Sequence, residues 1–154
     1  MALRDRLSDD LKRAMKARNA RRVSTLRLVF AAIQDREIRA EKPDTVATDG
    51  ELVVLLAKMV KQREESASIY EAGGRPELAA AEREEISIIR EFMPRQLADS
   101  ELRDAVRQVI ADTAASSPKD MGKVMAALKQ RHAGCIDFAK AGALVKELLA
   151  TSTP

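Results

Sequence analysis

Few side chains in the sequence could act as a nucleophile, a general acid or a general base. There is one histidine, His132, one cysteine, Cys135, and one tyrosine, Tyr70. His132 and Cys135 are close enough in sequence to meet at a helix end, as a thiolate nucleophile and its base must. No third group that would orient the histidine can be identified. We therefore interpret His132 as a residue of the last helical turn, favourable to the helix dipole, and Cys135 as a small buried hydrophobic residue.

The sequence also lacks the patterns that bind common cofactors and metals. Neither GxGxxG nor GxxxxGK[ST] occurs, so no glycine-rich phosphate loop is expected. A single cysteine excludes an intramolecular disulfide and a cysteine-rich metal site. The acidic clusters have no histidine near them, which rules out the di-iron site of helical bundles; they comprise Glu64, Glu65, Glu82, Glu84 and Glu85. We expect no cofactor and no metal, and we identify no catalytic residue.

Length and composition favour a small helical protein. The 154 residues suffice for one compact domain or two small ones. Only 3% of them are aromatic and there is no tryptophan, which is unfavourable for a β-sandwich. The charged start lacks the apolar run of a signal peptide, its aspartates are atypical of a transit peptide, and no stretch has the roughly 18 to 20 apolar residues of a membrane span. We expect a cytoplasmic protein that has no membrane partner.

Apolar residues at helical spacing predict four helices in residues 1–94. The first ends near Asn19, which can serve as its left-handed last residue or as the cap of the next helix. Its apolar face recurs every four residues and comprises Leu3, Leu7, Leu11 and Met15. The second runs to about Ala40 and has an apolar face of Val23, Leu26, Phe30 and Ile33.

The third and fourth helices have recognisable ends. Thr48 and Glu51 are spaced as a capping box at the start of a long third helix. This helix ends at a pair of glycines, of which Gly73 is expected in the left-handed conformation. Pro76 suits the first position of the fourth helix, which ends at the residue before Pro94 because proline disfavours the helical conformation there.

Three shorter helices are predicted in residues 95–151, and together they form a small bundle. Asp99 is the expected cap of the first, and Ser117 that of the second, which Gly134 ends. The third opens at Asp137, and its packing face comprises Phe138, Ala141, Leu144, Val145 and Leu148. No segment has the period of a β-strand. The expected fold is all-α, with an N-terminal four-helix subdomain over residues 1–94 and this three-helix module.

The net charge of +3 is distributed unevenly along the chain. Residues 1–42 carry a net charge of +6, residues 43–112 one of −6, and residues 113–154 one of +3. Two basic ends therefore flank an acidic middle. The ends could bind a polyanion, or the acidic helices could dock against them inside one molecule.

The N-terminal basic residues follow one another without an acid between them. Between Asp10 and Asp35 there is no acidic residue. The basic residues of this segment are Lys12, Arg13, Lys16, Arg18, Arg21, Arg22 and Arg27. Arg21 and Arg22 are the candidates for RNA binding here, unless they are paired with the acidic helices.

Candidate RNA contacts in the C-terminal module are mostly lysines. They are Lys119, Lys123, Lys129, Arg131, Lys140 and Lys146. Gly122 is a further candidate because it falls in the first turn of its helix, where exposed amides and the helix dipole suit a phosphate. Close packing of helices would explain this glycine as well. The aromatic residues sit at apolar positions, so recognition of phosphates and shape is favoured over stacking on single-stranded bases.

Three long stretches together resemble a known family. They are LKRAMKARNARRVSTLRLVFAAIQDREIR (11–39), KQREESASIYEAGGRPELAAAEREEISIIREFMPRQL (61–97) and DMGKVMAALKQRHAGCIDFAKAGALVKELL (120–149). In this order they resemble the GatB/YqeY family, and more closely the stand-alone YqeY-like proteins. Ala98 stands where the family often has a capping serine.

The resemblance implies a fold of two all-helical subdomains and a link to tRNA. The C-terminal module is similar to the tail of the B subunit of the glutamine-dependent Glu-tRNA(Gln)/Asp-tRNA(Asn) amidotransferase, which helps to hold tRNA in that enzyme. The family carries the label carbon-nitrogen ligase with glutamine as amido-N-donor. This chain offers no candidates for the Ser-Ser-Lys constellation of the amidase, for its ATP site or for metal ligands.

Three functions follow as hypotheses. The leading one is a non-catalytic helical protein that associates with tRNA or another structured RNA. The alternative is a protein interaction module in which the long third helix and the acidic middle bind an amidotransferase subunit or a second copy of the chain. The third is an accessory enzyme role in amide transfer.

Overall fold

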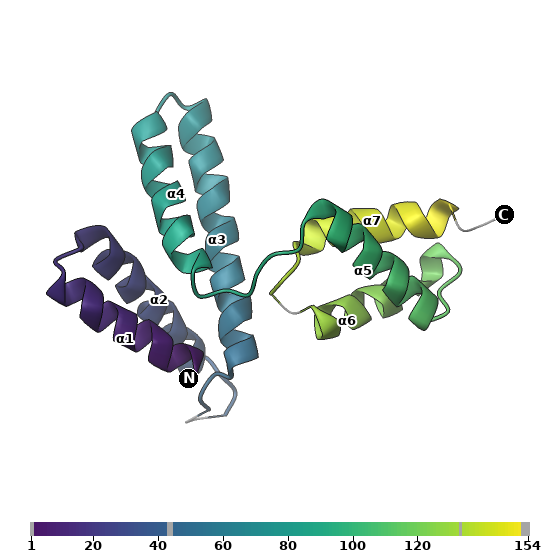
Figure 1. Ribbon diagram of the computed structural model, residues 1–154, viewed down its shortest axis with the longest axis horizontal. Coiled ribbons are helices and arrows are strands. Elements are labelled where there is room, and N and C mark those ends of the chain that lie inside the picture. The colour runs from purple at the N-terminus through teal and green to yellow at the C-terminus, as the bar shows by residue number, and fades with distance from the viewer. Residues whose placement is uncertain (1, 43–44, 133, 152–154) are drawn as a thin grey trace. The chain divides into compact units, whose positions relative to one another are not determined.

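The structure is a computed structural model that describes residues 2–42, 45–132 and 134–151 (Figure 1). All regular secondary structure in these ranges is helical, comprising seven α-helices and one short 3-10 helix. The all-α prediction is therefore confirmed. The chain divides into two compact units, of which the first ends at Pro94 and the second begins at Arg95.

The first unit is built from two antiparallel helical hairpins (Figure 1). Its helices are α1 (Leu3–Lys16), α2 (Ala20–Ile38), α3 (Asp49–Ala72) and α4 (Pro76–Arg90). The first hairpin, α1 with α2, packs against the lower parts of α3 and α4, whose connected ends project beyond it (Figure 1). The connection between α3 and α4 therefore lies at the tip of a two-helix arm.

All four helices contribute to one apolar core. Its fully buried large residues are Leu7, Leu26, Val29, Ile33, Leu52, Leu56 and Ile89. Each such side chain stabilises the fold by about 1.5 to 3 kcal/mol relative to exposure. Thr25 is the buried polar residue among them, and its hydroxyl donates to the Arg21 carbonyl oxygen at 2.9 Å, so no buried hydroxyl is left without a partner at this position.

The predicted buried face of α1 is correct at its start and wrong at its end. Leu3 and Leu7 are buried and Leu11 packs partly against the core, but Met15 is 44% exposed. The reason is geometric, since a four-residue step advances about 40° more than one full turn of an α-helix. After three such steps the side chain has rotated by about 120° away from Leu3. Ala14 is buried at this end of the helix instead.

Three helices end in the same backbone motif, with a left-handed residue just past the helix. After α1 this residue is Arg18 (φ 54°), whose N–H donates to the Met15 carbonyl oxygen, while the Asn19 N–H donates to that of Ala14. Of its two possible roles, Asn19 takes the second, because its side chain accepts from the Arg22 N–H and caps α2.

The same motif corrects the predicted end of α3. The left-handed residue there is Gly74 (φ 73°), and Gly73 has a negative φ. The capping box at the start of α3 is confirmed: the Glu51 N–H donates to Thr48 Oγ1 at 3.2 Å, and Glu51 Oε2 accepts from the Thr48 N–H at 3.0 Å. Pro76 opens α4 as predicted, but α4 ends at Arg90, before the predicted limit.

The second unit is a three-helix bundle preceded by an extended segment. It contains α5 (Asp99–Asp112), the 3-10 helix η1 (Pro118–Asp120), α6 (Met121–Arg131) and α7 (Phe138–Thr151). Its fully buried residues come from each α-helix and include Val106, Val109, Val124, Leu128, Val145 and Leu149. The turn after α5 places Ala114 (φ 52°) in the left-handed conformation, in the same motif as Arg18.

One predicted helix cap and one predicted packing residue in this unit are wrong. Asp99 is the first residue of α5, and Ala98 is its N-cap. Because alanine has no side-chain acceptor, the polar contact is made by Glu101, whose Oε1 accepts from the Ala98 N–H at 3.1 Å. In α7, Asp137 Oδ1 accepts from the Ala139 N–H at 2.8 Å, but Phe138 is 40% exposed and does not belong to the buried face.

Candidate nucleic-acid interface

Arg21, a predicted RNA contact, lies beside the acidic face of α4. Its Nε is 3.5 Å from Glu84 Oε2, and its Nη1 is 4.0 Å from Glu85 Oε1. Glu85 also accepts from Arg63 Nε of α3 at 2.9 Å, in an ion pair with both side chains largely buried. The acidic middle of the sequence therefore docks against basic residues of α2 and α3 inside the first unit.

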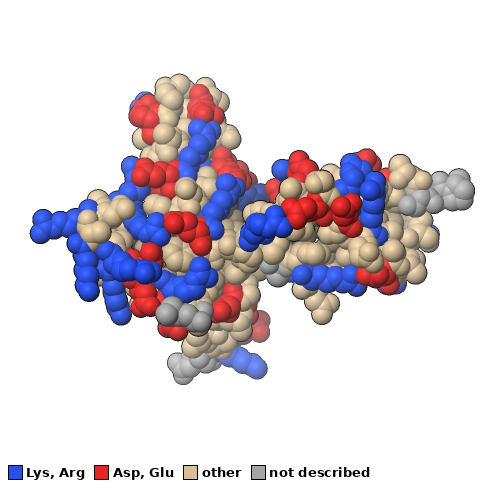
Figure 2. All heavy atoms as spheres, in the orientation of Figure 1, with Lys and Arg blue, Asp and Glu red and all other residues tan. Residues whose placement is uncertain are grey.

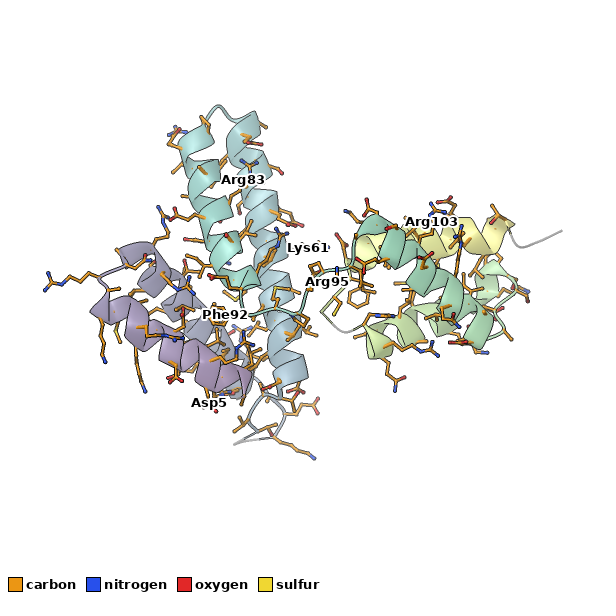
Figure 3. The ribbon with its side chains drawn as sticks, in the orientation of Figure 1. Asp5, Lys61, Arg83, Phe92, Arg95 and Arg103 are labelled. Atoms are coloured by element: carbon orange, nitrogen blue, oxygen red, sulfur yellow. The ribbon has the colours of Figure 1, made fainter. Side chains whose placement is uncertain are left out.

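Arg22 is held more tightly than Arg21. Its Nε donates to Asp10 Oδ2 and its Nη1 to Glu91 Oε2, both at 2.6 Å. The hydrogen bond to Asp10 is the main cause of a raised Arg22 pKa, with the bond to Glu91 adding to it. The guanidinium carbons of Arg22 and Arg6 also lie 5.9 and 5.8 Å from the ring centre of Phe92, at the base of α4 (Figure 3). In this structure Arg22 joins α1, α2 and the end of α4.

The arginines of the second unit are paired with carboxylates. The pairs are Arg95 with Glu101, Arg103 with Glu147, Arg107 with Asp104, and Arg131 with Asp112. Arg131, a predicted RNA contact, donates to Asp112 Oδ2 at 2.6 Å and is the main cause of a lowered Asp112 pKa. Lys140, another predicted contact, lies with its Nζ 3.7 Å from Asp99 Oδ1.

The remaining predicted lysines are exposed and form no ion pair with any residue that the structure describes. They are Lys119 on η1, Lys123 and Lys129 on α6, and Lys146 on α7. Basic and acidic side chains are interspersed over the visible face of this unit (Figure 2). The positive charge that a partner could use is therefore carried by lysines, each a point charge on a flexible stem.

Lys123 and Lys129 flank the outward face of α6. They are six residues apart, which separates them by about 120° around the helix. The helix surface between the two lysines carries three exposed residues, Gly122, Ala126 and Gln130. In the sequence, Gly122 precedes Lys123 and Gln130 follows Lys129. A Cβ placed on Gly122 would meet no atom within 4 Å, so the interpretation of this glycine as a close helix packing site is wrong. The structure brings these residues together on one open surface.

The amides that precede η1, just before α6, have a carboxylate partner. Asp120 Oδ2 accepts from the Ser116 N–H at 3.0 Å and from the Ser117 N–H at 3.3 Å. These two bonds hold the Asp120 pKa below its usual range, and the charge of Lys123 contributes to the same shift. A carboxylate thus binds the amides that precede η1, and the phosphate predicted at the first turn of α6 beside Gly122 stays a prediction.

The His132 and Cys135 region shows backbone contacts that shape the turn after α6. The His132 N–H donates to the Leu128 carbonyl oxygen at 2.9 Å, and the Cys135 N–H donates to the His132 carbonyl oxygen at 3.0 Å. Within the described ranges, no three His, Cys, Asp or Glu side chains are grouped so that they could hold a metal ion. In those ranges no helix combines the length and the apolar character needed to cross a membrane.

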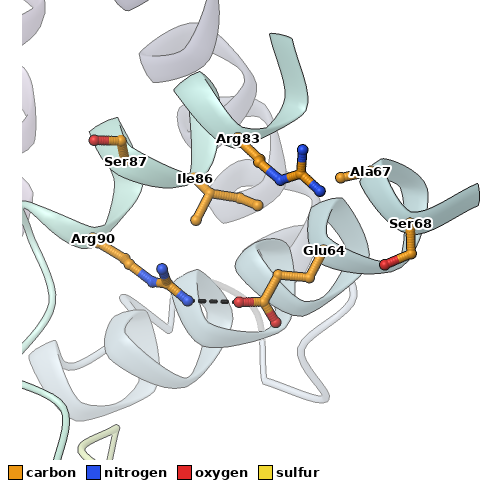
Figure 4. Close-up of a pocket in the computed structure, with 7 residues that line it drawn as sticks. All are labelled: Glu64, Ala67, Ser68, Arg83, Ile86, Ser87 and Arg90. Atoms are coloured by element: carbon orange, nitrogen blue, oxygen red, sulfur yellow. Dashed lines mark hydrogen bonds and ion pairs between the residues drawn. The ribbon is translucent and has the colours of Figure 1, made fainter. Parts of the chain in front are cut away.

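A groove that the sequence did not reveal runs between α3 and α4 (Figure 4). It has a volume of about 410 Å³ and is lined by Glu64, Ala67, Ser68, Arg83, Ile86, Ser87 and Arg90. Its arginines have acidic partners across the hairpin: Arg90 Nη2 lies 2.5 Å from Glu64 Oε1, and Arg83 Nη1 lies 2.6 Å from Glu71 Oε1. Arg83 holds the Glu71 pKa below its usual range. These contacts join the two helices of the arm.

Comparison with known proteins identifies a family model over nearly the whole chain and relatives over about two thirds of it or less. A family model described as Yqey-like protein matches residues 4–149. The protein named altered inheritance of mitochondria protein 41, mitochondrial, of Meyerozyma guilliermondii is 36% identical over 104 residues, which are 66% of this chain and 53% of that protein. The protein of the same name in Clavispora lusitaniae is 37% identical over 92 residues, which are 60% and 52% of the two chains. The protein of the same name in Saccharomyces cerevisiae is 31% identical over 96 residues, which are 62% of this chain and 51% of that protein. The chain spans about half the length of these curated relatives.

Proposed function

We propose that this chain, which belongs to the YqeY-like protein family, binds the phosphates of a structured RNA such as tRNA through its second unit and catalyses no reaction on it. The observation that supports this proposal is the pairing pattern of that unit. Its arginines have carboxylate partners, whereas Lys123 and Lys129 are exposed on α6 and form no ion pair with a described residue. These lysine charges are free to replace the counterions of a phosphate backbone.

The surface between the two lysines suits a backbone rather than a base. Gly122 and Ala126 are small and exposed, so a sugar-phosphate backbone can approach α6 closely. No aromatic ring lies between Lys123 and Lys129 in the sequence of α6, so this face has no platform for base stacking. Recognition here would follow the phosphates and the shape of a folded RNA. The proposal needs neither a cofactor nor a metal.

The test is binding of total tRNA to the full chain, measured by fluorescence anisotropy across a salt series. The variant Lys123→Gln/Lys129→Gln should bind more weakly at every salt concentration. Its plot of log affinity against log salt should be shallower by about 0.7 to 0.9 for each phosphate that the protein no longer neutralises. A matched control is Lys58→Gln/Lys61→Gln, which removes the same charge from two exposed positions of α3. Equal affinity and slope for the α6 variant and the unchanged chain would refute the mapping.

Arg131 provides a second comparison within the same helix. Because its guanidinium is bonded to Asp112, Arg131→Gln should reduce RNA affinity less than Lys129→Gln does. The same substitution should lower thermal stability more than Lys129→Gln, since it breaks a contact between α5 and α6. A larger loss of RNA affinity in Arg131→Gln than in Lys129→Gln would mean that the Arg131 pair opens to bind RNA.

A protein partner, such as an amidotransferase subunit or a second copy of the chain, is the second candidate. Ile69 of α3 is 71% exposed, and a groove runs between α3 and α4; both support docking of another helix. Glu85 belongs to the internal pair with Arg63, so the acids to reverse in a pulldown are Glu65 and Glu77, which are exposed and have no described ion pair. Capture of the candidate subunit that survives nuclease and disappears in Glu65→Lys/Glu77→Lys would favour this function over RNA binding.

The accessory role in amide transfer is the third hypothesis and has a direct test. It requires glutamine-dependent release of ammonia by the purified chain in the presence or absence of tRNA. We expect no release above the rate of a heat-denatured control. The cytoplasmic location stays a prediction, because the names of the fungal relatives assign those proteins to mitochondria.

A further inference from the structure

We infer that the end of the first hairpin, at the turn between α1 and α2, is a second surface for the phosphates of the same structured RNA. This surface, the N-terminal basic end, consists of Lys12, Arg13, Lys16, Arg18 and Arg27. It excludes Arg21 and Arg22, which the acidic residues of the unit already hold. The inference rests on the proposed function because it takes the same ligand, a structured RNA. Its residues belong to the first unit, whereas those of the proposed function belong to the second.

The charges of the N-terminal basic end have little internal compensation. Lys12, Lys16, Arg18 and Arg27 are exposed and form no ion pair with a residue of the described ranges. Arg13 is 76% exposed, and its Nη2 is 3.7 Å from Asp10 Oδ1, which belongs to the carboxylate already bonded to Arg22. A cluster of basic side chains stands out at this end of the first unit (Figure 2). The segment between Asp10 and Asp35 supplies no acid that could neutralise it.

The two helices bring these residues onto one end of the hairpin. Lys12 and Lys16 are four residues apart and lie on the side of α1 opposite the buried Leu3 and Leu7. Arg27 comes from α2, and its Nη2 lies 3.8 Å from Met15 Sδ in the last turns of α1. The helix dipole explains why basic residues are favourable at the end of α1. It does not explain a basic residue at position 27, because Arg27 lies well inside α2.

Arg18 is a residue of unusual type for its backbone conformation. It has a φ of 54°, in the left-handed region that favours glycine, and Gly74 fills the equivalent position after α3. Ala114 has the same conformation and an uncharged side chain, so this backbone conformation does not by itself require a charged residue. At Arg18 the left-handed backbone carries an exposed arginine in the turn between α1 and α2. Strain retained at such a place is typical of functional positions.

The chemistry of the surface favours a nucleic-acid backbone over a membrane or an acidic protein. Docking of α1 on a lipid surface would need an exposed apolar face, but Leu3 and Leu7 are buried in the core. Protein interfaces are stabilised by apolar or aromatic anchors at their centre. The half-exposed apolar residues nearest in sequence to this basic end are Met15 and Leu28, and none of the five defining residues is aromatic. Phosphates spaced along a folded RNA match a cluster of exposed basic groups that lacks such anchors.

The experiment compares two double variants of the full chain in the tRNA salt series. Lys12→Gln/Lys16→Gln should reduce affinity and make the salt plot shallower by about 1.4 to 1.8, the value for two phosphates. Lys58→Gln/Lys61→Gln, with the same reduction of charge at exposed α3 positions, should leave both values near those of the unchanged chain. Since the substituted side chains are exposed and form no described ion pair, far-ultraviolet circular dichroism should be unchanged. The unfolding midpoint should fall only slightly, through the loss of Lys16 from the last turn of α1.

The outcomes separate this inference from the proposed function. If only the α6 variant Lys123→Gln/Lys129→Gln weakens binding, the N-terminal basic end is not an RNA surface and the proposed function stands. If only the Lys12→Gln/Lys16→Gln variant does, the basic end binds RNA and the mapping onto α6 fails. We expect both to weaken binding, with effects that add in log affinity because the sites share no residue. Sedimentation with anionic phosphatidylserine vesicles, in the absence of any tRNA binding, would overturn the inference in favour of a membrane surface.

Discussion

Replacing Arg18 by glycine should make the protein more stable, although it removes a charged side chain. Arg18 has a φ of 54°, where an L-residue that has a Cβ is disfavoured by about 1 to 2 kcal/mol relative to the right-handed helical region. Glycine avoids this cost, but it also gives the unfolded chain more conformational freedom, which offsets about 0.4 to 1 kcal/mol of the gain. The net increase in the free energy of unfolding should be about 0.5 to 1 kcal/mol.

Two further positions in the same motif serve as controls. Ala114 (φ 52°) carries no charge, so Ala114→Gly measures the conformational effect alone and should give a similar gain. Gly74→Ala reverses the change and should lower stability by about 1 kcal/mol, since no atom lies within 4 Å of the added Cβ and only the φ of 73° opposes it. The difference between the Arg18 and Ala114 effects reports the electrostatic contribution of the guanidinium.

The assay is thermal and urea unfolding of the unchanged chain and the three variants, followed by circular dichroism. For a unit of about 60 to 100 residues, a gain of about 0.5 to 1 kcal/mol corresponds to a rise of about 2 to 8 °C in the unfolding midpoint. Arg18→Gly should at the same time lower tRNA affinity if the N-terminal basic end binds RNA. A decrease of stability in Ala114→Gly, or no change in Gly74→Ala, would show that the left-handed conformation carries no strain and would refute the reasoning.

Two more predictions concern ion pairs. Arg63→Ala should lower the free energy of unfolding by about 1 to 3 kcal/mol, because it leaves the largely buried Glu85 carboxylate without its closest charged donor; urea unfolding with Lys61→Ala of the same helix as control measures this. The pKa of Glu101 is lowered to about 2, first by its hydrogen bonds from Arg95 and then by that from the Ala98 N–H. A lowered pKa in the folded state stabilises at pH values above the ordinary value of 4.5, and this contribution disappears as the pH falls from 4.5 towards 2. Glu101→Gln should therefore lower stability at pH 7 and flatten its decline in that window, and an unchanged pH profile would contradict the assignment.

The features that the sequence predicted correctly depend on interactions between near neighbours. The capping box of Thr48 and Glu51, and the start of α4 at Pro76, are decided within one helical turn, and both are as predicted. The positions that went wrong depend on rotation along a helix or on alternatives one residue apart. Met15 rotates out of the buried face over three turns, and Gly73 and Gly74 are equally able to adopt the left-handed conformation.

The candidate interface shows the same limit more sharply. Charge counting in the sequence finds a basic segment, from which Arg21 and Arg22 were selected as RNA contacts and Arg18 and Arg27 were left out. The pairing of the first two arginines arises only when α4 packs beside α2 and brings Glu84 and Glu91 to them. These contacts join residues far apart in the chain, and no local pattern specifies them. The sequence feature that still indicates a basic surface is the long segment without an acidic residue between Asp10 and Asp35.

The separation of paired arginines from unpaired lysines in the second unit has a consequence for how the protein can evolve. Arg95 and Arg131 are tied to Glu101 and Asp112, so a change at either arginine disturbs the folded state. Lys123 and Lys129 form no ion pair with a described residue, so changes there act mainly on the charge that a ligand meets, and Lys123 adds a weak effect on Asp120. Affinity for an anionic ligand can therefore drift or be selected independently of folding. A lineage can retune the strength of binding on an unchanged helical scaffold.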